Sequence, residues 1–116
     1  MSAGPLFHIT SEEELRTARR EGVYRPAAFA REGFIHCSYR RQVVPVANRL
    51  FRGRQGLVLL EIDPARVSSP IVDENLEGGT ELFPHIYGPL PLAAVARVHA
   101  FVGGSDGLFE LSPELS

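Results

Sequence analysis

Leu57-Val58-Leu59-Leu60-Glu61-Ile62 is the strongest strand signal in this 116-residue chain. Every residue in it except Glu61 is apolar, and the pair Asp63-Pro64 directly after it is typical of a turn. A run that is apolar at successive positions predicts a strand whose two faces are both covered by other parts of the protein. We therefore expect a buried strand over residues 57–62.

The other strand signals are shorter. We expect further strands over residues 6–10, 33–37, 70–73 and 94–102. Residues 23–32 predict an irregular connection, and residues 74–80 and 88–92 predict loops. Pro84 and Pro89 predict a loop stiffened at both ends between them, because proline fixes its own backbone and restricts the preceding residue.

One helix is marked by local signals at both ends. Ser11 followed three positions later by Glu14 forms a capping box, and Gly22 suits the left-handed residue that closes a helix. These signals predict a helix over residues 12–21. Its acidic first turn is also favoured by the helix dipole.

A second helix is expected after Ser38, which we predict to cap a short helical turn. Pro45 lacks an N–H and clashes with the preceding turn of a helix, so the turn is not expected to continue through it. The helix itself is therefore predicted from about Val44 to Gly53.

Two main helices and short strands, without repeated strand–helix alternation, predict an α+β fold. The length suits one domain over residues 1–116, with a core at about 6–102 and a weakly specified tail at 103–116. Neither a signal peptide nor a membrane-length apolar run is visible, so we expect a cytoplasmic protein without a membrane partner. We also expect a monomer or a weak dimer.

The charge balance argues against a nucleic-acid partner. The formal net charge is -2, and all twelve basic residues are arginine. Proteins that bind nucleic acid through its phosphates usually carry a basic excess. The absence of lysine excludes lysine Schiff-base chemistry, and the lone Cys37 excludes an intramolecular disulfide.

Two histidines stand in apolar, turn-forming surroundings, His36 within residues 34–38 and His85 within residues 81–90. Side chains alternate along a strand, so His36 is predicted to share a face with Phe34 and Ser38. His8 is predicted to reach the same side as His36 if the strands are adjacent and if the core takes Phe7, Ile9, Ile35 and Cys37. The two histidines would then form the floor of a polar cleft.

Residues that could carry chemistry gather in these segments. The candidate catalytic residues are His36, His85 and Glu74, and the candidate substrate-binding residues are His8, Ser38, Asn75, Phe83 and Tyr87. No metal site is predicted, because no histidine pair has the helical i, i+4 spacing. A triad of Ser38, a histidine and Asp73 lacks the G-x-S-x-G elbow. The histidines could instead be structural, as we expect for His99.

The order of motifs along the chain resembles one family. The motifs are Phe34-Ile35-His36-Cys37-Ser38, Arg49-Leu50-Phe51-Arg52-Gly53 at the end of a proline-interrupted helix, residues 57–64, residues 74–79 and residues 82–90. Together they are similar to the small, mostly bacterial family catalogued as domain of unknown function 952. The similarity extends from about Leu6 to Val102, and I-H-x-S with F-P-H-x-Y-G-P-L is its most specific part.

That family is grouped by fold with the ADP-ribosyltransferase-like proteins, which bind NAD in a cleft between two small sheets. The resemblance implies a compact split β-sheet flanked by helices, with NAD as a substrate. It assigns the ribose contact to His36, nicotinamide stacking to Tyr87, and the carboxylate role to Glu74 or Glu81.

Two functions follow from the resemblance. One is an enzyme or degenerate enzyme that binds NAD or an ADP-ribose-like nucleotide in a histidine-lined cleft. The alternative is a non-catalytic module of the same fold that binds a small ligand or a protein.

Overall fold

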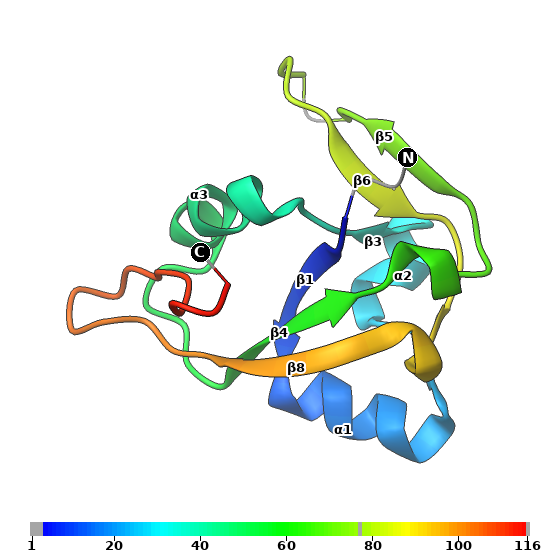
Figure 1. Ribbon diagram of the computed structural model, residues 1–116, viewed down its shortest axis with the longest axis horizontal. Helices are drawn as coiled ribbons and strands as arrows, with labels where there is room; N and C mark the ends of the chain where they lie inside the picture. The colour runs from blue at the N-terminus through cyan, green and yellow to red at the C-terminus, as the bar shows by residue number, and fades with distance from the viewer. Residues whose placement is uncertain (1–3, 77, 116) are drawn as a thin grey trace.

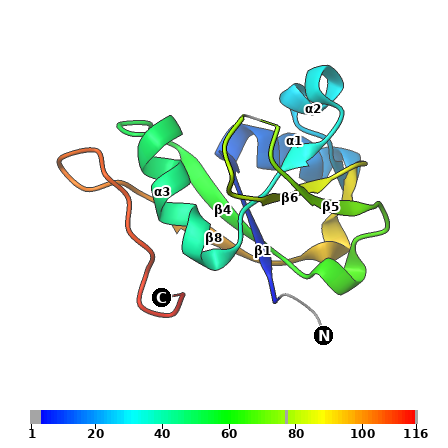
Figure 2. The ribbon, with the colours of Figure 1, turned by 90° about the horizontal axis from the view of Figure 1, so that it is seen from above.

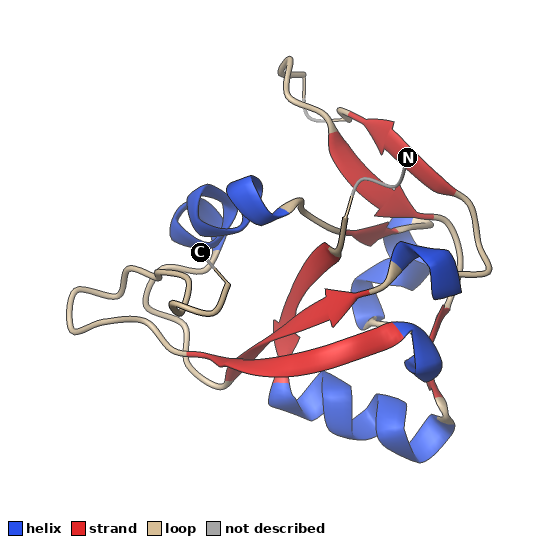
Figure 3. Ribbon diagram, viewed as in Figure 1, coloured by secondary structure: helices blue, strands red, loops and turns tan. Residues whose placement is uncertain are grey.

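The computed structural model describes residues 4–76 and 78–115, which form three antiparallel sheets and three α-helices (Figures 1 and 3). The helices are α1 (Glu12–Glu21), α2 (Ala27–Glu32) and α3 (Arg40–Leu50). The strands are β1 (Leu6–Ser11), β2 (Val23–Tyr24), β3 (Ile35–His36), β4 (Leu57–Ile62), β5 (Ile71–Glu74), β6 (Phe83–Ile86), β7 (Leu90–Pro91) and β8 (Val95–Phe101). Short 3₁₀ turns follow β4 at Pro64–Arg66 and β7 at Leu92–Ala94. The fold is α+β, as predicted.

The first sheet has the order β1-β4-β8, so the apolar stretch at residues 57–62 is its central strand. Leu57 and Leu59 point into one apolar cluster, and Val58 and Leu60 point into another. Both faces of β4 are therefore covered, as predicted. The prediction for α1 is also confirmed, since Ser11 Oγ accepts the Glu14 N–H at 3.0 Å. Gly22 closes the helix with φ +82°, a backbone conformation that favours glycine.

The second and third sheets were not expected as such. β2 pairs with β7, and β6 lies between β3 and β5. The expected loop around Pro84 is thus a central strand, although proline cannot donate to a ladder. It is tolerated here because β3 ends at His36, before the position opposite Pro84, and the Pro84 carbonyl still accepts the Cys37 N–H at 3.0 Å.

The irregular connection predicted for residues 23–32 is wrong. Residues 23–24 form β2, and the alanine-rich piece forms α2, which Gly33 closes with φ +83°. Pro26 stands at the N-cap in extended conformation, so its missing N–H lies before the helix and interrupts none of its bonds. Helix propensity of the alanine-rich segment therefore prevailed over the turn signal.

The start and end predicted for α3 are also wrong. The helix begins at Arg40 rather than Val44, contains Pro45, and ends at Leu50. Its N-cap is Tyr39, whose N–H is accepted by the Gln42 side chain at 3.0 Å. Ser38 does not cap the helix, because its backbone N–H and carbonyl both pair with Phe7.

Gln42 explains why the helix starts before the proline. The residue is 2% exposed, and its side-chain amide also donates to the Leu82 carbonyl at 2.8 Å and to Glu81 at 3.0 Å. A buried amide with three partners fixes the first turn of α3 in place. This tertiary anchor holds the helix across Pro45.

The core is divided into two clusters rather than one. Phe7 and Ile9 pack with α3 in one cluster, whereas Ile35 and Cys37 pack in the other. The condition that one core takes all four residues is therefore not met, and β1 and β3 belong to different sheets that meet at the Phe7–Ser38 bridge. Figures 1 and 2 show the reason, since α3 and the β3-β6-β5 sheet lie on opposite sides of β1.

The segment after Val102 contributes to the core. Phe109 and Leu115 are buried, and the Asn48 side chain on α3 accepts the Phe109 N–H at 2.7 Å. Figure 1 shows this segment returning beside α3. Among the described residues, no helix combines the length and the apolar character needed to cross a membrane.

Candidate functional site

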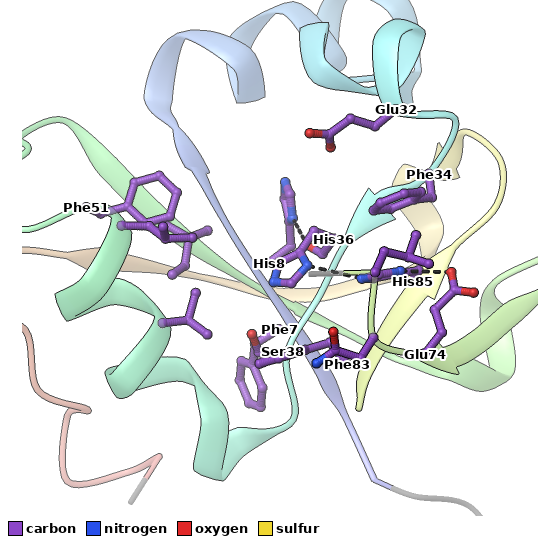
Figure 4. Close-up of a pocket in the computed structure, with 15 residues that line it drawn as sticks. Phe7, His8, Glu32, Phe34, His36, Ser38, Phe51, Glu74, Phe83 and His85 are labelled. Carbon is purple, nitrogen blue, oxygen red and sulfur yellow. Dashed lines mark hydrogen bonds and ion pairs between the residues drawn. The ribbon is translucent and has the colours of Figure 1, made fainter. Parts of the chain in front are cut away.

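A pocket of about 480 Å³ lies between α3 and the β3-β6-β5 sheet, with β1 at its base (Figure 4). The predicted site residues that line it are His8, His36, Ser38, Glu74, Asn75, Phe83 and His85. Tyr87 lies outside the lining but donates its hydroxyl proton to Glu74. The volume falls within the range of small-molecule sites.

A chain of hydrogen bonds runs through the pocket wall from Glu74 to His36. Glu74 Oε2 lies 2.9 Å from His85 Nδ1, and His85 Nε2 lies 3.2 Å from His36 Nδ1 (Figure 4). The register of the β3-β6 pair places the two histidines directly opposite each other. We refer to Glu74, His85 and His36 as the relay.

The partners fix most of the protons in the relay. Hydrogen bonds from Tyr87 and His85 lower the pKa of Glu74, so its carboxylate is ionised and accepts from both. His85 Nδ1 must therefore carry a proton, and in two neutral rings His85 Nε2 accepts from His36 Nδ1–H. The Glu74 carboxylate therefore orients the His85 ring, and His85 in turn orients His36.

Burial differs along the relay. The His85 side chain is 4% exposed, whereas that of Glu74 is 22% exposed and His36 is partly buried. All three members line the pocket, and His85 is the most buried of them. This arrangement can orient a base, because each ring is held by its neighbour.

Aromatic rings brace the relay. Phe34 stacks on His85 with ring centroids 4.1 Å apart and planes 12° apart, and Phe83 is tilted against His36 at 5.2 Å. Phe34 and Phe51 line the pocket but were not among the predicted site residues. Phe34 could have been predicted as a site residue, because side-chain alternation along the strand places it on the same face as His36.

His8 links three segments of the structure. Its Nδ1 lies 2.6 Å from the His36 carbonyl and its Nε2 lies 2.6 Å from the Tyr24 hydroxyl. A carbonyl only accepts, so Nδ1 carries the proton and Nε2 of the neutral ring accepts from Tyr24. Burial lowers the pKa of His8 to about 4, which keeps the ring neutral near pH 7.

Three other polar residues are engaged in holding loops. Asn75 closes the loop after β5, because its amide donates to the Glu81 carbonyl at 2.6 Å and accepts the Gly79 N–H at 3.1 Å. The Glu81 carboxylate accepts from Arg41 and Gln42, so it faces α3 and is not part of the pocket lining. Asp73 accepts from the Tyr39 hydroxyl, and burial, followed by this hydrogen bond, raises the pKa of Tyr39 to about 12.

The clustering of histidine and carboxylate side chains also bears on metal binding. Within residues 4–76 and 78–115, no three histidine, cysteine, aspartate or glutamate side chains are grouped to hold a metal ion. The relay contains three such residues in a row, but they hydrogen-bond to one another. Its geometry suits proton sharing rather than ligation.

The family model described as "Protein of unknown function (DUF952)" matches residues 9–98 of the chain. The chain belongs to the DUF952 family. The match includes the whole relay, and it confirms the family suggested by the I-H-x-S and F-P-H-x-Y-G-P-L motifs. No curated protein is significantly similar to this DUF952 chain.

Solved structures from one bacterium share the fold. The crystal structure of protein CC0527 from Caulobacter crescentus is 31% identical, covers 96% of this chain and 97% of its own, and superposes with a TM-score of 0.85. A crystal structure of a double mutant of CC0527 gives a TM-score of 0.84, and its solution NMR structure gives 0.73 over 90% of both chains. These similarities establish the family and the fold of this DUF952 protein.

Proposed function

We propose that this DUF952 protein is an ADP-ribosyltransferase-like enzyme, or a degenerate one, that binds NAD or an ADP-ribose-like nucleotide in the relay pocket. The observation that carries the proposal is the relay itself, which ends at His36 on an aromatic-walled pocket of about 480 Å³. The resemblance implies a cleft between two small sheets, and the proposal is supported by a pocket whose lining includes β1 of one sheet and β3, β5 and β6 of another.

The relay supplies the groups that such a reaction needs. His36 would contact the ribose as the bond to nicotinamide breaks and nicotinamide leaves with the bonding electrons. The Glu74 carboxylate, which holds His85 and through it His36, would keep that contact in place. Phe34 lines the pocket whereas Tyr87 does not, so we assign nicotinamide stacking to Phe34 and the orientation of Glu74 to Tyr87.

A second function is favoured by one specific observation. The Glu74 carboxylate already accepts hydrogen bonds from both His85 and Tyr87. A carboxylate held in this way is less available to steady a positively charged ribose, which suits a non-catalytic small-ligand module. This alternative expects binding without turnover, and tolerance of Glu74→Gln.

Ligand-dependent thermal unfolding tests the binding part of the proposal. Wild type, His36→Ala and His99→Ala would be heated with NAD, ADP-ribose, NADP and simple nucleotides. A ligand that binds the folded state raises the melting temperature. We expect NAD or ADP-ribose to stabilise wild type and His99→Ala but not His36→Ala, because His99 lies on β8, pairs with Glu61 and does not line the pocket.

Turnover is tested separately by chromatographic detection of nicotinamide released from NAD. Release that is lost in His85→Ala and strongly reduced in Glu74→Gln supports the enzyme. Binding without release favours the non-catalytic module. Absence of any nucleotide shift, with a large loss of stability in His36→Ala alone, would make the histidines structural and refute the proposal.

A further inference from the structure

The relay pocket continues into a second compartment of about 240 Å³. The residues that line both are His8, Ile9, Glu32, Phe34, His36 and Phe51. The shared walls, His8 and His36 among them, make the two cavities neighbours, and we refer to them together as the groove. A ligand bound at the relay therefore has room to extend past His8 towards α1 and the turn after α3.

The two compartments differ in charge. Of the described residues that line the relay pocket, none is an arginine, and Glu32 and Glu74 are acidic. The second compartment is lined by Arg54, and the chain has no lysine that could serve in its place. The positive charge among the described groove residues thus lies in the second compartment, at Arg54.

Arg54 is available to bind an anion. Its guanidinium carbon lies 5.5 Å from the ring centroid of Phe51, which lines both compartments. Within the described ranges, no carboxylate lies at ion-pair distance from Arg54. A guanidinium stacked on a ring and lacking a carboxylate partner retains its planar donors for a phosphate.

The acidic residues of the second compartment are already engaged. Glu14 accepts the Ala27 N–H at 3.1 Å, which ties α1 to the start of α2. Glu32 lies 3.9 Å from Arg31. Both stand on the helical side of the groove, whereas Arg54 stands on the turn between α3 and β4. An anionic group bound to Arg54 would therefore lie across the groove from the Glu14 and Glu32 carboxylates.

We propose that the groove binds an elongated ligand whose uncharged or aromatic end occupies the relay pocket and whose phosphate or pyrophosphate lies against Arg54. This inference rests on the proposed function and specifies it. The chain would distinguish a phosphorylated nucleotide from its nucleoside through one arginine outside the relay.

Calorimetric titration of matched ligands and variants tests the assignment. NAD and nicotinamide riboside share the ring and the ribose, but only NAD carries the pyrophosphate. Arg54→Gln is expected to weaken NAD binding about tenfold or more, as loss of a charge-assisted contact does, while leaving the binding of nicotinamide riboside unchanged. Arg54→Lys retains the charge and should recover part of the loss.

Arg52→Gln is the matched control. It removes the same charge two positions from Arg54, and Arg52 lines neither compartment. Its NAD affinity should equal that of wild type. NAD binding that depends on His36 but is unchanged in Arg54→Gln would overturn the phosphate site and leave the proposed function standing. If neither ligand binds wild type, the proposed function itself is refuted. If Arg54→Gln and Arg52→Gln lose the same NAD affinity, the effect comes from the net charge of the protein, and the phosphate site is overturned.

Discussion

Replacing His8 with glutamine is expected to flatten the loss of stability that this protein undergoes in mild acid. His8 is held neutral between the His36 carbonyl and the Tyr24 hydroxyl, and burial lowers its pKa to about 4. In the unfolded chain the same ring has an ordinary pKa of about 6.5. Between these two values the unfolded chain binds a proton that the folded protein does not.

The sign and the size of the effect follow from this difference. Where the unfolded state binds more protons, the free energy of unfolding rises with pH. The contribution of His8 is therefore complete above about pH 6.5 and is lost as the pH falls to about 4. At roughly 1.4 kcal/mol per pH unit, the full loss is about 3 kcal/mol, a large part of the stability of a typical domain.

Urea unfolding followed by circular dichroism measures this loss at several values between about pH 7.5 and 4.5. Wild type would be compared with His8→Gln, whose amide can still donate to one partner and accept from the other. His99→Gln controls for removal of a histidine away from the pocket. Wild type and His99→Gln should lose stability more steeply than His8→Gln below about pH 6.5, by about 2.5 kcal/mol at pH 4.5. Parallel curves for wild type and His8→Gln would refute the reasoning.

Three further predictions concern stability. Tyr24→Phe removes the hydroxyl that donates to His8 Nε2 at 2.6 Å. Thermal unfolding should show a loss of about 1–3 kcal/mol in the free energy of unfolding, and an unchanged melting curve would contradict that bond. Gly88→Ala would bring a Cβ to 2.0 Å from the Ser69 hydroxyl oxygen and 2.7 Å from its Cβ, so we expect a loss of about 1–3 kcal/mol in urea that Ser69→Gly restores in the double variant. Phe109→Ala should lower the free energy of unfolding by about 3–5 kcal/mol, because this ring is 1% exposed; a change near zero would show that the C-terminal segment does not belong to the core.

Local signals sufficed where a few neighbouring residues settle the structure. Ser11 and Gly22 bound α1 because a cap and a left-handed terminus each depend on one residue and its immediate backbone. The apolar run at residues 57–62 predicted a strand covered on both faces, because successive apolar side chains point to opposite faces of a strand. Such features are readable without knowledge of the rest of the chain.

Local signals failed where distant partners decide. Pro45 argued against an early start of α3, but Gln42 anchors the first turn to residues 81 and 82 across the structure. Pro84 argued for a loop, but β3 and β5 flank it and make it a strand. In both places bonds between segments far apart in sequence outweigh a proline penalty.

Motifs and local patterns were enough to predict the family, the α+β class, the ends of α1 and the chemical types available, namely histidines, carboxylates and aromatic rings. Which of these side chains meet depends on how the strands pair. His36 and His85 are 49 positions apart, and the register of β3 against β6 sets them opposite each other. A shift of one residue would turn every side chain to the other face of the sheet, so the relay exists because the strands pair in this register.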